Sequence, residues 1–260
     1  MDDSYYVEKF LSFLEVERRD PDLPFLNELT KSHQLKVRWE NLSKIVDYEK
    51  GYATEQFLPP MDVYIDRIVE QGGGGTCWTL AVGFRWLLER LGYEVHYLYM
   101  DHGHLCLRVE LDQPYYVDVG YTAPLFKAYP LLQSFTVTND REVFAYEVQQ
   151  DKIEVTRTPG PFKTLSTKPT SLESLRSVFL ESNHWETGKM LKDLLVFGYI
   201  DGVPTSLTTN TLKQFLPDQV VTSTLTDQEV VDVIKAFKID RNLYLQAKEI
   251  FQRRQSQKQD

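Results

Sequence analysis

The chain has 260 residues, of which 42% are hydrophobic and 13% aromatic, as is typical of a globular protein with a substantial core. Its net charge of −9 argues against a broad nucleic-acid-binding face, because neutralising phosphates requires clustered Lys and Arg. No apolar run is long enough to span a bilayer, and no apolar signal segment follows the acidic N-terminal residues. We therefore expect a soluble cytoplasmic protein in which Cys77 and Cys106 are free thiols.

The first ninety residues are predicted to be mostly helical. Apolar residues recur at steps of three and four over residues 5–17, 24–33 and 61–68. The short segment 37–42 shows no clear periodicity, and Pro59-Pro60 closes a loop ahead of the third helix. These patterns indicate a helical N-terminal region with one stretch left unassigned.

Four consecutive glycines, residues 72–75, lead into Thr76 and Cys77, and the apolar spacing from Leu80 to Leu91 predicts a helix that begins near the cysteine. A helix N-terminus favours an anion, so it lowers the pKa of a thiol and promotes the thiolate. A glycine run is expected where the backbone takes positive φ or something approaches it closely. A structureless loop is the simpler alternative. Phosphate binding is a weak interpretation, because no Lys-Ser/Thr pair follows as in a P-loop.

After Gly92 the hydrophobic pattern changes to period two. Strands are predicted at residues 94–100 and 104–111, with a turn at 112–114 and a returning strand at 115–119. An even register would place His104 and Asp118 on the same face of this hairpin, although the sequence does not fix the register. A carboxylate in an apolar strand needs a partner, and an imidazole N–H is the natural one.

His104 has competing interpretations. Taken alone, a strand histidine is more often satisfied by ordinary hydrogen bonds than used in catalysis. His96 and His102 are rival bases. A metal site built from these histidines and Cys106 would match no familiar zinc spacing, so no metal is expected.

The remainder of the chain mixes strands and helices. Strand-like runs occupy residues 134–138, 143–148, 152–157 and 162–165, and their short lengths suggest a small antiparallel barrel or sandwich. A helix is predicted at 171–179 with Ser171 as its cap, followed by a strand at 191–199 and strand-like pieces near 207 and 212–215. Thr226 and Glu229 form a capping-box pattern that opens a helix, and a polar helix is predicted at 243–254.

Three motifs in this order resemble the arylamine N-acetyltransferases. They are Gly-Gly-x-Cys ending at Cys77, His-Leu-x-Leu-x-Val beginning at His104, and Val-Asp-Val-Gly-Tyr around Asp118. His33 with residues 39–42 resembles the N-terminal part of that family, and residues 182–227 resemble its C-terminal part. The resemblance therefore covers most of the chain.

The resemblance implies an α+β fold with a cysteine-protease-like catalytic core. A helical domain would span residues 1–90, an antiparallel β-barrel domain residues 91–186, and an α/β lid residues 187–260. The implied activity is ping-pong N-acetylation of an arylamine or hydrazine by acetyl-CoA, through an acetyl-Cys77 intermediate. The partners would be acetyl-CoA and a small aromatic amine, with no nucleic acid or membrane, and the protein would be a monomer or weak homodimer.

The family's functional positions imply roles for six residues. Cys77, His104 and Asp118 would form the catalytic triad. Trp39 and Tyr121 would bind the acceptor substrate, and Gly120 would lie in the segment that binds the acetyl-CoA co-substrate.

The chain also departs from the family pattern. The family usually has Arg at the position of Gly73 and an acidic or amide residue at that of Thr79. Its Phe-Gly pair appears here as Tyr121-Thr122, and the interval of 27 residues from Cys77 to His104 is shorter than usual. Three alternatives therefore stay open: a thiol hydrolase or transglutaminase-like enzyme without CoA, an amide synthase using a tethered acyl group, and a catalytically silent binding protein.

Overall fold

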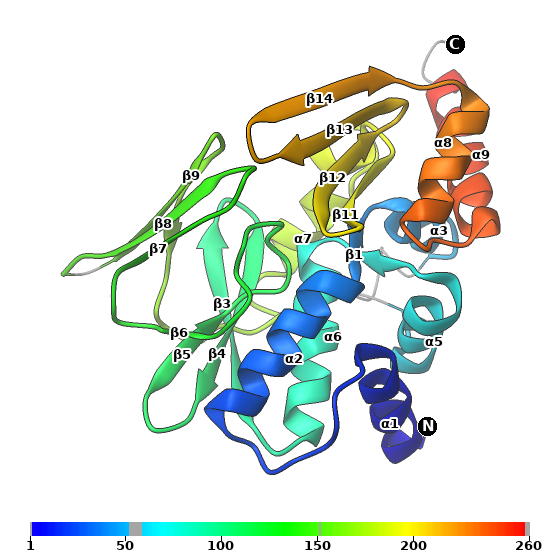
Figure 1. Ribbon diagram of the computed structural model, residues 1–260. Coiled ribbons are helices and arrows are strands. Elements are labelled where there is room, and N and C mark those ends of the chain that lie inside the picture. Colours follow the sequence, from blue (N-terminus) through cyan, green and yellow to red (C-terminus); the bar gives the residue numbers. More distant parts are fainter. Residues whose placement is uncertain (1, 52–58, 151, 258–260) are drawn as a thin grey trace. The chain divides into compact units, whose positions relative to one another are not determined.

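The computed structural model describes residues 2–51, 59–150 and 152–257, which form two compact units (Figure 1). The first unit contains Met1–Lys36 and Cys77–Arg176, and the second contains Val37–Thr76 and Ser177–Asp260. The α+β class and the antiparallel barrel-like sheet predicted from the sequence are confirmed. The predicted domain boundaries at residues 90 and 186 stay a prediction.

Helices of the first unit follow the predicted apolar spacing. They are α1 (Asp3–Leu14), α2 (Leu23–Lys36) and α6 (Cys77–Arg90). The Asp2 side chain caps α1 by accepting hydrogen bonds from the first backbone N–H groups. Helix α6 packs against strands β3 and β4, and Figure 1 shows α2 beside it. Helix α6 is therefore fixed to the sheet by its apolar face.

The described strands of the first unit form one antiparallel eight-stranded sheet in the order β6-β5-β4-β3-β10-β9-β8-β7. Their bounds are β3 (Glu94–Asp101), β4 (His104–Glu110), β5 (Pro114–Val117), β6 (Tyr129–Pro130), β7 (Phe135–Thr138), β8 (Val143–Val148), β9 (Ile153–Thr158) and β10 (Phe162–Leu165). The edge strands β6 and β7 meet through the stacked rings of Tyr129 and Phe135, whose centroids are 3.9 Å apart. Side-chain packing therefore closes the curled sheet around its core.

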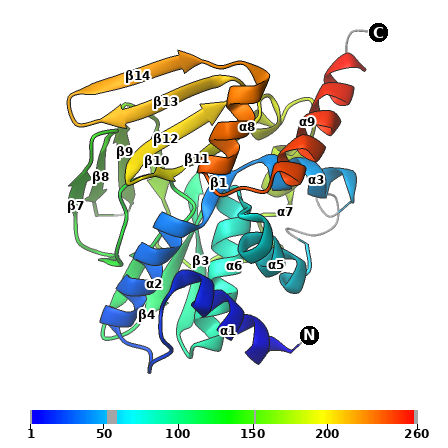
Figure 2. The ribbon, with the colours of Figure 1, turned by 45° about the vertical axis from the view of Figure 1, so that its right-hand side comes forward.

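The second unit is built on a separate sheet with the order β14-β13-β12-β11-β1-β2. Its strands are β1 (Arg38–Glu40), β2 (Gly74–Gly75), β11 (Leu195–Ile200), β12 (Val203–Thr208), β13 (Thr211–Leu216) and β14 (Gln219–Thr224). Its helices are α3 (Leu42–Glu49), α5 (Met61–Gln71), α7 (Arg176–Asn183) from its second residue onward, the 3₁₀ turn η1 (Lys189–Leu191), α8 (Asp227–Ala236) and α9 (Arg241–Ser256). Figure 2 shows α8 and α9 side by side, and α9 also packs on α3.

Several predicted elements differ from the structure. The helix predicted at 171–179 begins later, as α7 (Arg176–Asn183), because Ser171 and Ser174 hydrogen-bond each other in a preceding turn. The strand predicted from residue 191 begins at Leu195, after η1. Strands β1 and β14 and helix α3 were not predicted. The capping box of Thr226 and Glu229 is confirmed at the start of α8.

Both cysteines are free thiols. Among the described residues, no helix combines the length and apolar character required to cross a membrane.

His33 on α2 is buried between aromatic rings of two other helices. It is 1% exposed, its ring centroid lies 4.9 Å from that of Phe84 and 6.1 Å from that of Phe10, and neither ring nitrogen has a hydrogen-bond partner. Burial lowers the pKa of His33 to about 3, since charging the ring would strand a cation among apolar groups. The folded state thus excludes a proton that the unfolded chain binds near pH 6.5.

This imbalance predicts a specific loss of stability in acid. The pKa of His33 is lower in the folded chain than in the unfolded chain, so protonation favours the unfolded chain. The free energy of unfolding is therefore unaffected by His33 above pH 6.5, and between pH 6.5 and pH 3 it falls by about 1.4 kcal/mol per pH unit for this one proton. We expect His33→Leu to flatten the acid limb of the unfolding free energy, measured by urea titration between pH 4.5 and 7. His102→Gln, which removes an exposed imidazole, is the control. Equal slopes in wild type and His33→Leu would contradict the prediction.

Candidate active site

Cys77 occupies the first position of helix α6, as the sequence pattern predicts. Leu80, Phe84 and Leu87 are buried along this helix and hold it in the first unit. The helix N-terminus provides partial positive charge where the sulfur lies. The local fold therefore favours a thiolate at Cys77 before any side chain is considered.

The last two residues of the glycine segment, Gly74 and Gly75, form a very short strand, and Gly72 ends helix α5. Strand β2 pairs in parallel with β1, with Gly74 opposite Arg38 and Gly75 opposite Trp39. A Cβ atom on Gly74 would lie 1.9 Å from the carbonyl oxygen of Arg38, so only glycine permits this approach. The N–H of Gly74 donates a 2.8 Å hydrogen bond to the buried Glu40 carboxylate. Close backbone approach is therefore the physical reason for glycine here, and the segment is not a structureless loop.

Gly73 leaves space for an arginine that comes from helix α5. A Cβ atom at Gly73 would lie 2.9 Å from Cγ of Arg67 and 3.1 Å from Cδ2 of Leu243. The buried Arg67 guanidinium donates two hydrogen bonds to Asp47, of 2.8 and 2.6 Å, and its charge also interacts with Glu40. The stem of Arg67 thus fills the volume that a side chain at position 73 would require.

His104 and Asp118 meet through the even register that the sequence permits. Leu107 faces Val117 across the β4–β5 pair, so residues of like parity share a face. His104 Nε2 lies 2.7 Å from Asp118 Oδ2, and both side chains are buried. Asp118 follows the last residue of β5 instead of lying within the strand, which frees its carboxylate to turn towards His104.

Four donors surround the Asp118 carboxylate. Oδ1 accepts hydrogen bonds from the backbone N–H groups of Gly120, at 3.0 Å, and Tyr121, at 2.9 Å. Oδ2 accepts from His104 and, at 2.6 Å, from the hydroxyl of Tyr116. A carboxylate has about four lone-pair sites, so this buried anion is fully hydrogen-bonded.

The electrostatics favour a thiolate and an imidazolium. Burial alone would raise the pKa of Cys77, but the hydrogen bond and charge of His104 and the N–H of Leu105 outweigh it and lower that pKa. Burial opposes a charge on His104 as well, yet the Asp118 charge and hydrogen bond, with Cys77, raise the pKa of His104 to about 9. Because Asp118 engages Nε2, Nδ1 is the ring nitrogen left for the Cys77 sulfur.

The rival histidines lie away from this carboxylate. His96 contacts Glu94 at 3.2 Å, and His102 is 89% exposed in the turn between β3 and β4. Within residues 2–51, 59–150 and 152–257, no group of three or more His, Cys, Asp and Glu side chains is placed to hold a metal ion.

The other expected site residues divide between the units. Gly120 packs on the backbone of Cys77, where an added Cβ would lie 2.7 Å from Cys77 Cα, and its N–H is engaged by Asp118. The Tyr121 ring lies against His104, with centroids 4.4 Å apart. Trp39 belongs to strand β1 of the second unit. The substrate-binding roles of Trp39 and Tyr121 and the cofactor-binding role of Gly120 stay predictions.

Three contacts of the site were not anticipated from the sequence. Tyr116 of β5 binds the carboxylate of Asp118, which lies two positions later in the chain, and this spacing of two was the sequence signal for the contact. Gln34 Nε2 donates to the carbonyl oxygen of Asp118 at 2.7 Å, and no local pattern marks that glutamine. Trp78 Nε1 donates to the carbonyl oxygen of Gly103 at 2.9 Å, which ties the residue after Cys77 to the residue before His104.

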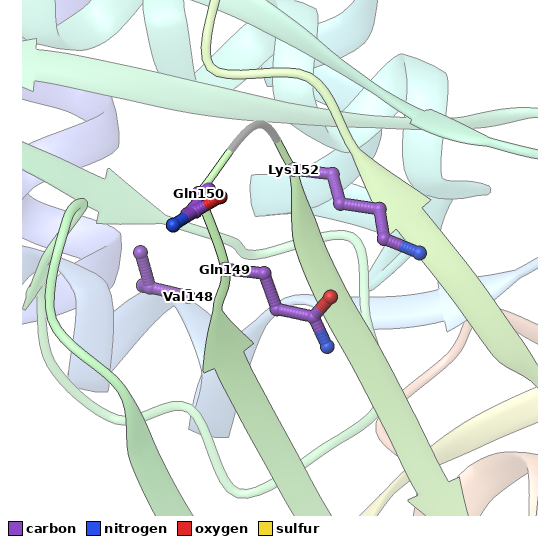
Figure 3. Close-up of a pocket in the computed structure, with 4 residues that line it drawn as sticks. All are labelled: Val148, Gln149, Gln150 and Lys152. Carbon is purple, nitrogen blue, oxygen red and sulfur yellow. The ribbon is translucent and has the colours of Figure 1, made fainter.

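A hollow elsewhere in the first unit has no comparable chemistry. It lies at the end of strands β8 and β9, and Figure 3 shows its lining residues, Val148, Gln149, Gln150 and Lys152. Its one charged side chain among these, Lys152, pairs with Glu154 at 2.5 Å. The cluster of half-buried Cys77 with buried His104 and Asp118 is therefore the candidate active site.

Known proteins similar to this chain show its family. A family model described as N-acetyltransferase matches residues 22–249. The chain belongs to the arylamine N-acetyltransferase family, and it is an acetyltransferase enzyme. No curated protein matches the chain.

Solved arylamine N-acetyltransferases share the fold. The enzyme from Mycobacterium marinum is 19% identical, with a TM-score of 0.77 over 94% of this chain and 96% of that chain. The same enzyme in complex with CoA gives 19% identity and a TM-score of 0.75, over 94% and 98%. An enzyme from Bacillus cereus, described as having a Cys-His-Glu catalytic triad, is 16% identical. Its TM-score is 0.73 over 90% of this chain and 98% of that chain.

The lowered pKa of Cys77 predicts a reactive thiol at neutral pH. We expect iodoacetamide to alkylate Cys77 readily at pH 7, and His104→Gln to slow this reaction by about tenfold or more, because burial and the charge of Asp118 would then raise the thiol pKa against the N–H of Leu105 only. Peptide mass spectrometry would locate the label. Cys106 serves as an internal control, since burial raises its pKa well above the ordinary value. Equal rates in both proteins would show that His104 does not activate the thiol.

The contact between Gly120 and Cys77 predicts intolerance of a single methyl group. Gly120→Ala would force the Cys77 backbone to move, so we expect a loss of about 2 kcal/mol in unfolding free energy and slower alkylation of Cys77. Gly202→Ala is the matched control, because its added methyl meets nothing within 4 Å and tests only a positive φ. A Gly120→Ala protein with wild-type stability and alkylation rate would refute this packing argument.

Proposed function

We propose that this enzyme transfers an acetyl group from acetyl-CoA to a primary arylamine or hydrazine through an acetyl-Cys77 intermediate. The observation that carries the proposal is the chain of contacts from buried Asp118 through buried His104 to half-buried Cys77. The CoA complex of the similar Mycobacterium marinum enzyme supports acetyl-CoA as the donor.

In the first half of the cycle the Cys77 thiolate attacks the carbonyl carbon of the acetyl thioester. The tetrahedral intermediate collapses by breaking the carbon–sulfur bond to CoA. His104, protonated in the resting pair, gives its proton to the departing CoA sulfur and becomes neutral. Asp118 keeps the imidazole oriented and stabilises its charged form. Acetyl-Cys77 and free CoA result.

In the second half the nitrogen of the amine attacks the acetyl carbon of acetyl-Cys77. Neutral His104 accepts a proton from that nitrogen as the amide forms and the Cys77 thiolate leaves. The thiolate–imidazolium pair is thereby restored. Donor and acceptor use the same sulfur in turn, which gives ping-pong kinetics.

The N–H of Leu105 is a suitable donor for the oxyanion, because it already hydrogen-bonds the Cys77 sulfur. The glycine segment is less suited, since Gly73 N–H donates to the Arg67 carbonyl oxygen and Gly74 N–H donates to Glu40. We assign Trp39 and Tyr121 to the acceptor site and Gly120 to the segment beside the co-substrate, following the family motif. Two free thiols fit a reducing cytoplasm, where we place the enzyme as a monomer or weak homodimer.

Intact-protein mass spectrometry tests the proposal. Incubation with acetyl-CoA should add one acetyl group to the wild-type protein and none to Cys77→Ala, and an arylamine should then remove it with formation of the amide. Discharge by water alone would favour a thiol hydrolase, and acylation by another thioester but not by acetyl-CoA would favour an amide synthase. An unmodified Cys77 with every thioester would indicate a silent binding protein and end the proposal.

A further inference from the structure

We propose that Tyr116 is a positioning residue of this site. Its hydroxyl occupies one of the two lone-pair sites of Asp118 Oδ2 and so determines how the carboxylate faces His104 and how firmly His104 holds its proton. The proposal deepens the function above, because it concerns the same Cys77, His104 and Asp118 cluster.

Among the four donors to the Asp118 carboxylate, Tyr116 is the one that shares an oxygen with His104. The two backbone donors, from Gly120 and Tyr121, hold Oδ1. Oδ2 is shared by His104 Nε2, at 2.7 Å, and the Tyr116 hydroxyl, at 2.6 Å. Tyr116 is thus the side chain that competes with His104 for the same oxygen, and it leaves that oxygen one site to offer the imidazole.

The structure fixes the Tyr116 hydroxyl in place and keeps it a donor. The side chain is fully buried, and its ring centroid lies 5.1 Å from that of Tyr146 and 6.4 Å from that of Phe135. Burial, and next the charge of Asp118, raise the pKa of Tyr116 well above its ordinary value. A neutral phenol facing a carboxylate can only donate.

Because two donors share Asp118 Oδ2, the carboxylate stabilises protonated His104 less than it would if His104 were the only donor to that oxygen. The phenol draws negative charge from Oδ2. Without it, a lone pair stays unpaired in an apolar core, and the oxygen's full charge acts on His104. Removal of the hydroxyl should therefore raise the pH at which His104 loses its proton.

Other charged and titratable groups around the pair are present in the wild type and in the Tyr116 variants alike. Cys77 on α6 interacts directly with His104, and buried Cys106 on β4 interacts with the charge of Asp118. The Tyr121 ring lies on His104 and has the Arg157 guanidinium 4.4 Å from its centroid, with Glu142 paired to that guanidinium. Their influence is common to the wild type and the variants.

Tyr146 provides a matched control. It is as buried as Tyr116, belongs to the same core, and its hydroxyl donates a 2.8 Å hydrogen bond to the carbonyl oxygen of Leu131, away from Asp118. Tyr116→Phe and Tyr146→Phe therefore each remove one buried hydroxyl donor. They differ in whether that donor serves the carboxylate.

The experiment is a nitrogen-15 NMR titration of the His104 imidazole in the wild type, Tyr116→Phe and Tyr146→Phe. We expect the wild-type midpoint near pH 9 to rise by about 0.5–1 pH unit in Tyr116→Phe and to stay in place in Tyr146→Phe. Tyr116→Leu should give the same direction if Tyr116→Phe does not fold. An unchanged or lowered midpoint, or an equal rise in both Phe variants, would overturn the proposal.

The titration separates this proposal from the proposed function. Acetylation of wild-type Cys77, followed by mass, tests the transferase chemistry. The His104 midpoint requires no acyl donor or amine. A protein that never accepts an acetyl group can still show the Tyr116 effect, and an active transferase can fail to show it.

Discussion

The site depends on the hydrogen bonds that satisfy the buried Asp118 carboxylate. An unpaired anion in this core would be strongly destabilising, so its four donors are a condition of folding as much as of chemistry. Those donors come from β4, from β5 and from the backbone after β5, and Gln34 of α2 binds the Asp118 carbonyl as well. Satisfying one charge therefore aligns the elements that place His104 next to Cys77.

Much of this arrangement could be predicted from periodicity and local chemistry. The alternation from His104 to Leu111 identified the two faces of β4, and the apolar spacing after Cys77 identified α6 as a helix that begins near that cysteine. The Thr226 capping box identified the start of α8. Each of these signals lies within a few residues of the chain and reflects a backbone rule that holds in any fold.

The features that could not be predicted depend on partners far away in the sequence. Strands β1 and β2 have three and two residues, too few for a periodic pattern, and they exist because Arg38 and Trp39 pair with Gly74 and Gly75. The register of β4 against β5 likewise follows from the whole ladder and not from the turn alone. The short strands β1 and β2 and the register of β4 against β5 are therefore determined by pairing between distant segments and not by local sequence propensity.

The same distinction changes the meaning of Gly73, the clearest departure from the family pattern. Judged by sequence, the glycine segment lacks an arginine, which keeps a catalytically silent binding protein open as an alternative. In the structure, the aliphatic part of the Arg67 side chain, from α5, packs beside Gly73. Its buried guanidinium donates hydrogen bonds to Asp47 and interacts with the charge of Glu40. Glu40 in turn holds the Gly74 N–H three positions before Cys77. The stem of Arg67 thus occupies the volume beside Gly73, which gives a packing reason for glycine at a position where the family usually has arginine.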